Sequence, residues 1–247
     1  MQLYIGNKNY SSWSMRPWVL MKQTGIAFAD VMVRFDSFQA DSKFKATLSQ
    51  AVGSGPMTVA TPGKVPLLVD NGFVVWDTLA IAEYLAEKFP ELHLWPADMQ
   101  ARARARSVCA EMHSGFSALR SHFPMNIEAH LPDIGARMLA EKADAWADLA
   151  RIVQMWTDLL GAHGGPFLFG HYSTVDAYFA PVVKRIVTYA LPVPPPVSDY
   201  VAAVEASAGV VAWTKQALAE HDFIDFDEPY RKSGVSGESG ESGKSGE

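Results

Sequence analysis

Apolar residues change their spacing along this chain close to residue 90. Before that point they form short runs between turn residues, and after about residue 98 they recur at steps of three and four. Short runs bounded by turn residues predict strands, whereas steps of three and four predict helices. The expected elements of the first part are strands near 2–5, 31–36, 65–70 and 73–76, with helices near 16–24 and 77–88.

The order of these elements predicts the domain organisation. Strand–helix–strand followed by strand–strand–helix is a thioredoxin-like order, so we expect an α/β domain over residues 1–89, a linker over 90–98 and an all-helical domain over 99–230. Residues 49–63 are rich in Gly, Pro, Ser and Thr, which predicts a loop with little regular helix. Residues 231–247 repeat Ser-Gly with Glu and Lys, which predicts a disordered tail.

Two long helices are expected in the second part, near 99–122 and near 136–161. Their apolar residues, tryptophans included, fall on one face of each helix, so we interpret them as core. Further along, Ser173 and Asp176 have the spacing of a capping box, in which two side chains bond the free backbone N–H groups of a helix start. Their expected role is in folding.

Composition narrows the class of protein. The chain has 247 residues, 49% hydrophobic and 19% charged, with a net charge of −6, and no basic stripe that would favour nucleic acid. The single cysteine, Cys109, excludes an intrachain disulfide and is expected to lie buried in a helix. No Cys/His cluster has metal-ligand spacing, no apolar run approaches the roughly 20 residues that span a bilayer, and the N-terminus lacks a signal-peptide pattern. We therefore expect a cytoplasmic protein without a metal or membrane partner.

The most informative segment runs over residues 64–85. Val65 and Pro66 open an apolar run, an Asn-Gly pair then favours a tight hairpin turn, and a return strand follows. Asp77 and Thr78 begin an apolar helix, whose first turn offers free N–H groups and a partial positive charge. The segment predicts a site for an anionic ligand.

A second polar loop joins the expected first strand to the first helix. It runs over residues 6–17 and contains Ser11, Ser12 and Ser14, followed by Arg16. Serines at such a junction are interpreted either as plain helix N-caps or as donors to a reactive group. Arg16 is interpreted as a structural arginine, bonded to backbone or to a carboxylate.

Together the two motifs resemble the glutathione transferases. The resemblance covers about residues 1–228 and implies a cis Pro66, whose neighbour Val65 binds the cysteinyl part of glutathione through its backbone. It also implies that Asp77 and Thr78 hold the γ-glutamyl group, although Glu or Gln and Ser are commoner there. No metal is implied.

The order Ser-Ser-x-Ser-x-Arg looks like the zeta class (maleylacetoacetate isomerases) and more loosely the theta and delta classes. The resemblance implies that a serine hydroxyl hydrogen-bonds the glutathione sulfur: Ser11 by zeta spacing, or Ser12 by delta spacing. A free thiol has a pKa of about 8.5, and one charge-assisted hydrogen bond of about 1.5–3 kcal/mol is the right size to lower it by about two units. Trp13 stands where the thiol-disulfide branch of the family requires a cysteine.

The family also places its acceptor substrate between the serine loop and the first helix of the helical domain. By position, five residues are candidate contacts for a small electrophile: Tyr10, Trp13, Met112, His113 and Phe116. For the histidine, an ordinary surface or capped helix residue is the alternative. Family members form homodimers, and we expect the same here.

The resemblance therefore implies a transferase that activates glutathione as a thiolate for attack on an electrophilic small molecule. Two alternatives stay open. One is a glutathione-dependent cis-trans isomerase of the maleylacetoacetate type, against which Trp13 and Trp18 count because zeta enzymes have Cys and Arg there. The other is a non-catalytic binding or regulatory protein of the same fold.

Overall fold

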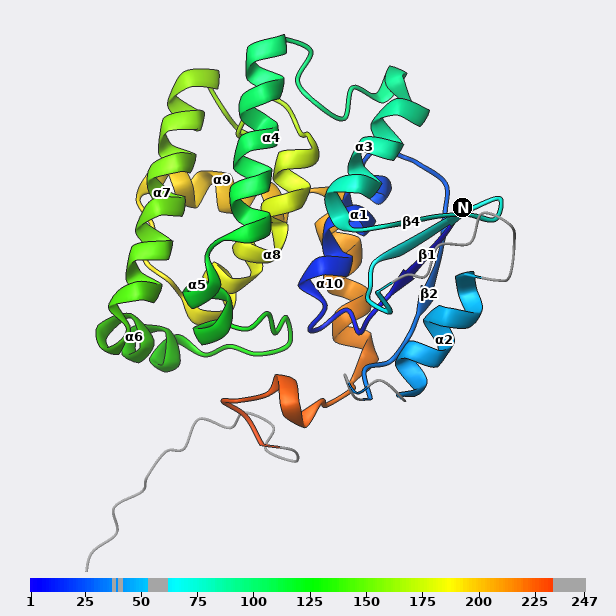
Figure 1. Ribbon diagram of the computed structural model, residues 1–247. Helices are drawn as coiled ribbons and strands as arrows, with labels where there is room; N and C mark the ends of the chain where they lie inside the picture. Colours follow the sequence, from blue (N-terminus) through cyan, green and yellow to red (C-terminus); the bar gives the residue numbers. More distant parts are fainter. Residues whose placement is uncertain (37–38, 40–41, 53–61, 233–247) are drawn as a thin grey trace, which may run out of the picture.

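The computed structural model describes residues 1–36, 39, 42–52 and 62–232 (Figure 1). Its first part is a four-stranded sheet with the order β2-β1-β3-β4. β1 and β2 are parallel, whereas β3 runs antiparallel to both β1 and β4. The strands are β1 (Gln2–Ile5), β2 (Ala29–Met32), β3 (Leu67–Asp70) and β4 (Phe73–Trp76).

The predicted fold class is confirmed, and one strand is displaced from its expected place. The expected strand at 31–36 is β2, which lies at 29–32 because β1 offers only four residues for pairing. The N–H of Val33 donates the last bond, to the carbonyl of Ile5 at 2.8 Å. Residues 33–36 continue past the end of β1 toward the serine loop.

Helices of the first part are α1 (Ser12–Gln23), α2 (Lys43–Val52) and α3 (Thr78–Lys88). The predicted start of α1 near residue 16 was four residues late, because Pro17 lies inside the helix and not at its first position. The expected loop over 49–63 was wrong for residues 49–52, which end α2, while its residues 53–61 lie outside the described residues. α2 forms because Phe44 and Leu48 are buried against the sheet, 3% and 0% exposed.

The second part is helical, as predicted, but its first two helices are interrupted. The helix expected at 99–122 is broken at Gly115 and Phe116, and Phe116 has a φ of +56°. The helix expected at 136–161 is divided at Lys142. The elements are η1 (Pro90–Leu92), α4 (Met99–Ser114), α5 (Ser117–His122), α6 (Pro132–Glu141), α7 (Ala143–His163), α8 (Thr174–Tyr189), α9 (Pro195–Glu205), α10 (Ala208–Glu220) and η2 (Asp225–Asp227).

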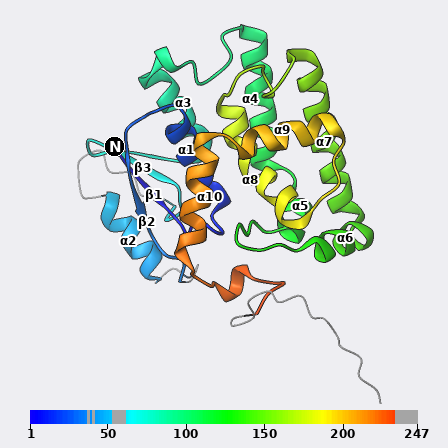
Figure 2. The ribbon, with the colours of Figure 1, turned by 180° about the vertical axis from the view of Figure 1, so that it is seen from behind.

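One apolar core joins the sheet layer to the helices. α1 packs against both α8 and α10, and the view from behind shows α10 running alongside α1 (Figure 2). Trp18 of α1 meets Trp213 of α10 edge-on, with ring centroids 5.3 Å apart, and both are almost fully buried. This core crosses the predicted boundary near residue 90. The division of the chain into two domains there stays a prediction.

Two smaller expectations, the capping box and the buried cysteine, are confirmed. Ser173 and Asp176 form the predicted capping box at the start of α8. Cys109 is buried in the middle of α4, as expected. None of the described helices is long and apolar enough to cross a membrane. Within the described part of the chain, no three His, Cys, Asp or Glu side chains are grouped so that they could hold a metal ion.

Candidate functional site

Two adjoining cavities contain most of the predicted site residues. We call the first the helix-start cavity; it has a volume of about 240 Å³ and is lined by Asp77 and Thr78. We call the second the serine cavity; it has a volume of about 450 Å³ and is lined by Ser11 and Ser12. Val65 is in the wall of both, so a ligand lying across Val65 could occupy both cavities at once.

Much of the wall of the helix-start cavity comes from the chain around β3, β4 and the start of α3, and Trp13 of α1 and His113 of α4 complete it. Val65, Pro66, Asp77 and Thr78 all line it. The peptide bond between Val65 and Pro66 is cis, as the resemblance implied. The four residues predicted to hold glutathione are therefore brought together on one side of one cavity.

Asp77 is the N-cap of α3 and is held in an unusual conformation. Its Oδ1 accepts the N–H of Leu79 at 2.8 Å, and its φ is +75°, a value that residues other than glycine rarely adopt. Such strain costs on the order of 1–3 kcal/mol and is commonly found at binding sites. The other oxygen, Oδ2, lies 3.3 Å from Nε2 of His113, and the Asp77 side chain is 41% exposed. The carboxylate is thus fixed but accessible.

Thr78 is the end of a chain of polar contacts that sequence reasoning did not find. Its Oγ1 lies 2.6 Å from the hydroxyl of Tyr178, which in turn lies 2.8 Å from Nδ1 of His113. Burial raises the pKa of Tyr178 to about 12, so its hydroxyl keeps its proton at neutral pH. Together with the contact between His113 and Asp77, these bonds tie α4 and α8 to the start of α3. Tyr178 follows the apolar spacing of α8, and nothing in that pattern distinguishes it from core.

The two candidate serines differ in their bonding. Ser11 is the N-cap residue of α1, but its hydroxyl caps no helix N–H; it donates to Oγ of Ser14 at 2.7 Å. Oγ of Ser14 also accepts the N–H of Gly6 at 3.1 Å. The Ser12 hydroxyl has no hydrogen-bond partner among the residues that the structure describes. The interpretation of Ser11 as a plain side-chain cap is therefore wrong, and Ser12 has the freer hydroxyl.

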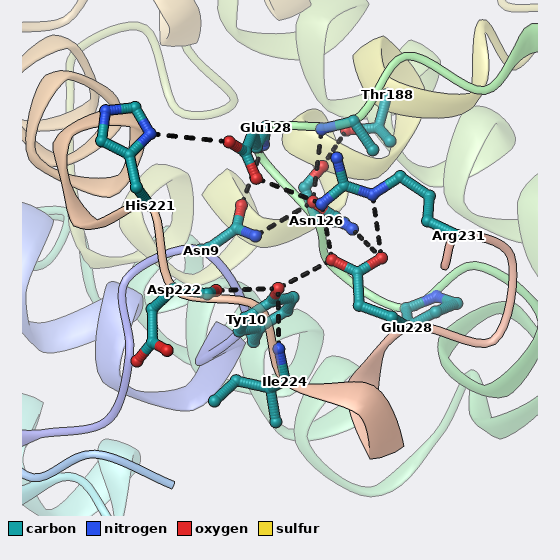
Figure 3. Close-up of polar contacts among 12 residues, drawn as sticks. Asn9, Tyr10, Asn126, Glu128, Thr188, His221, Asp222, Ile224, Glu228 and Arg231 are labelled. Carbon is teal, nitrogen blue, oxygen red and sulfur yellow. Dashed lines mark hydrogen bonds and ion pairs between the residues drawn. The ribbon is translucent and has the colours of Figure 1, made fainter. Parts of the chain in front are cut away.

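Tyr10 presents its ring to the serine cavity and turns its hydroxyl away. The hydroxyl lies 2.7 Å from Oε1 of Glu228 and 3.1 Å from the carbonyl oxygen of Asp222 (Figure 3). Burial and the bond to Glu228 raise the pKa of Tyr10 far above its usual value. Tyr10 can therefore contact an acceptor through its ring but is a poor donor to sulfur.

The remaining predicted acceptor contacts fall into two groups. Trp13 and His113 line the helix-start cavity, with ring centroids 5.0 Å apart in an edge-on arrangement. Met112 and Phe116 are buried in the core, 0% and 7% exposed, and line neither cavity. The structure thus brings Trp13 and His113 to the site but not Met112 or Phe116.

Arg16 lies directly behind Trp13. Its guanidinium carbon lies 4.2 Å from the Trp13 ring centroid and 4.4 Å from that of Tyr178, and Arg120 approaches the same Trp13 ring at 4.6 Å. Burial lowers the pKa of Arg16 to about 10, which leaves it charged at neutral pH. Its Nε and Nη1 have no hydrogen-bond partner in the described part of the chain, so these atoms do not form the expected bond to backbone or carboxylate there. Arg16 instead supplies positive charge behind the cavity wall.

Comparison with known proteins points to one family. Residues 10–88 match the family model described as glutathione S-transferase, N-terminal domain. Glutathione S-transferase 1 of Dianthus caryophyllus is 30% identical over 51% of this chain and 56% of its own length, and a probable maleylacetoacetate isomerase of Caenorhabditis elegans is 30% identical over 48% and 49%. The chain thus spans about half the length of these curated relatives.

The likeness to a solved structure covers more of the chain than the likeness to these curated relatives. A glutathione transferase homolog from Burkholderia GL BGR1, crystallised with bound glutathione, is 26% identical and has a TM-score of 0.63. The likeness covers 89% of this chain and 98% of that structure.

Proposed function

We propose that this chain, which belongs to the glutathione S-transferase family, activates glutathione as a thiolate for attack on an electrophilic small molecule. The observation that carries the proposal is the meeting of two groups of residues at Val65. On one side lies the start of α3 with an accessible carboxylate, and on the other lies a serine loop at the start of a second helix.

Glutathione fits this arrangement group by group. Its γ-glutamyl end carries an ammonium, which suits the exposed carboxylate of Asp77, and a carboxylate, which suits Thr78 and the N–H groups that begin α3. The backbone of Val65 would pair with the peptide of the cysteinyl residue. This placement directs the sulfur toward Ser11 and Ser12.

The serine loop supplies what a thiolate needs. A hydroxyl donor and the N-terminus of α1 both favour the charged form of the sulfur. The buried guanidinium of Arg16 adds a positive charge behind Trp13. We assign the donor to Ser11, whose hydroxyl would turn from Ser14 to the sulfur. We keep Ser12 as the alternative because its hydroxyl has no partner among the described residues.

The isomerase alternative uses the same activated thiol. There the sulfur adds to a double bond, rotation follows and the thiol leaves again. The similarity to a protein named as a probable maleylacetoacetate isomerase supports it. Trp13 and Trp18 at the positions of the zeta-class Cys and Arg weigh against it. A homodimer and a cytoplasmic location remain predictions.

The test is a matched pair of variants, Ser11→Ala and Ser12→Ala, assayed with glutathione against halogenated, enoyl and maleyl electrophiles. Loss of one hydrogen bond to a thiolate should lower turnover by about ten- to a hundredfold and raise the pKa of bound glutathione, read from thiolate absorbance. We expect this for Ser11→Ala and little change for Ser12→Ala. The reverse result would move the role to Ser12. Wild-type protein that conjugates or isomerises none of the electrophiles would refute the proposed function.

A further inference from the structure

The chain from Glu220, the last residue of α10, returns to the serine loop and is bonded to it through Glu220 and Asp222. The N–H of Lys8 donates to the carboxylate of Glu220 at 2.9 Å, and Nδ2 of Asn7 donates to Oδ2 of Asp222 at 2.8 Å. We call residues 220–231 the C-terminal strap. The strap fixes its own position relative to the loop that carries Ser11 and Ser12.

Glu228 is the centre of this attachment. It is 5% exposed, and its carboxylate accepts from the Tyr10 hydroxyl at 2.7 Å, from Nδ2 of Asn126 at 2.8 Å and from Nη2 of Arg231 at 2.6 Å (Figure 3). Its charge is therefore compensated by a guanidinium and two neutral donors. A buried carboxylate with that many donors is held in one position.

The neighbours of this bonded pair both face the serine cavity. Ser11 follows Tyr10, Asp227 precedes Glu228, and both line the cavity. The hydrogen bond between Tyr10 and Glu228 thus holds the chain next to Asp227 at the cavity that Ser11 also lines.

Among the acids of the strap that are at least partly buried, Asp227 differs in lacking a partner within the described part of the chain, whereas Asp225 is exposed to solvent. Glu220, Asp222 and Glu228 all accept hydrogen bonds, whereas the Asp227 carboxylate has none with the residues that the structure describes, and no ion pair. It is partly buried, and burial together with the charge of Glu228 raises its pKa to about 6. It is therefore mostly ionised at neutral pH, in a place where an ionised group without a partner is unfavourable.

The rest of the cavity wall indicates which kind of ligand group could pair with this carboxylate. The rings of Tyr10, Trp13 and Phe44 line the cavity, and aromatic faces attract cations. Lys45 and Lys64 also line it, but neither comes within the 4.0 Å of an ion pair with Asp227. Glutathione with its ammonium placed at Asp77 has only its thiolate and its glycyl carboxylate left for this cavity, and neither of these anions can pair with Asp227.

We propose that Asp227 determines the specificity for the acceptor, selecting electrophiles that have an aromatic or other flat apolar body and a cationic or hydrogen-bond-donating group. This proposal rests on the proposed function only in taking the bound molecule to be the acceptor of glutathione. The recognition itself is a property of the cavity and can be measured without turnover.

The first experiment measures binding of unreactive probes to the full chain. Benzyltrimethylammonium and its neutral isostere neopentylbenzene have the same shape and differ in charge. Wild-type protein should bind the cation about ten- to a hundredfold more tightly, and Asp227→Asn should abolish that preference. Asp227→Glu, which keeps the charge, should retain it. Asp225→Asn, in the same short helix but at an exposed residue, should leave it unchanged.

The second experiment separates this inference from the proposed function. Glutathione is offered para-substituted benzyl bromides that carry either a trimethylammonium or a tert-butyl group, and kcat/KM is compared between wild type and Asp227→Asn. A loss confined to the cationic acceptor supports both proposals. Probe binding that depends on Asp227 without conjugation of any bromide would refute the transferase and keep the cation site. Equal preference for the cation in wild type and Asp227→Asn would overturn the assignment of Asp227 while leaving the transferase intact.

Discussion

Tyr10→Phe should destabilise the protein measurably although it removes a single oxygen atom. The hydroxyl lies 2.7 Å from a buried carboxylate, and a hydrogen bond to a charged group is worth about 1.5–3 kcal/mol. Taking a urea m-value of about 3 kcal/mol/M, the unfolding midpoint should fall by about 0.5–1 M. Tyr4→Phe is the control, because the Tyr4 hydroxyl has no partner among the described residues; it should move the midpoint little.

A double-mutant cycle with Glu228→Gln tests whether the charge of Glu228 is responsible. Glutamine keeps an acceptor at the same place but is neutral, so the cost of Tyr10→Phe in that background should fall to about 0.5–1.5 kcal/mol. The difference between the two backgrounds, about 1 kcal/mol, is the coupling energy. If Tyr10→Phe cost no more than Tyr4→Phe, the strap would not be attached through this bond. If it cost the same in both backgrounds, the charge of Glu228 would not be responsible for the strength of the bond.

Three further predictions concern the site and the core. Asp77→Asn should weaken glutathione binding by about 1–3 kcal/mol in calorimetry and change the stability of the empty protein by less than about 1 kcal/mol, since Asn is an equally good cap; equal weakening for an analogue without the α-ammonium would show that Asp77 only caps the helix. Asp227 has a folded-state pKa of about 6 against about 3.9 unfolded, so the folded state binds more protons between those values and loses stability as pH rises through them. In thermal unfolding, the stability of Asp227→Asn relative to wild type should therefore rise from pH 4 to 6 and stay constant above pH 6. Gly135→Ala should destabilise by about 3 kcal/mol in denaturant unfolding, because its Cβ would come within 1.9 Å of a backbone oxygen. Gly161→Ala should be neutral or stabilising, because apart from its own helix backbone and chain neighbours no described atom lies within 4 Å of the new Cβ.

The sequence predicted the fold well where local patterns decide it. The Asn-Gly turn, the apolar runs and the capping box at Ser173 are signals confined to a few residues, and each formed as expected. The helix at 43–52 was missed because its amphipathic pattern is short. Two of its apolar residues, Phe44 and Leu48, can be identified as core only once the sheet that they pack against is known.

The site was predictable to the extent that one chain segment builds it. Asp77, Thr78, Val65 and Pro66 belong to one strand-turn-helix unit, so a motif could find them together. Tyr178 and Asp227 reach the cavities or their neighbours from helices far along the chain. The first looks like core and the second like an acidic surface residue, and only the packing of α8 and the strap shows otherwise.

Met112 and Phe116 show the opposite error. Their position in the sequence predicts that their segment borders the site, but it does not predict the direction of each side chain. On α4, residues 112 and 113 point about 100° apart, so His113 faces the cavity while Met112 faces the core.

The most direct test of the account is a calorimetric titration of the chain with glutathione, repeated with cysteinylglycine, which lacks the γ-glutamyl group. We expect saturable binding of glutathione, a rise in melting temperature by linkage, and binding of cysteinylglycine at least about tenfold weaker, because Asp77 and Thr78 have nothing to hold. Absence of any binding or thermal shift at millimolar glutathione, or equal binding of the two thiols, would contradict it.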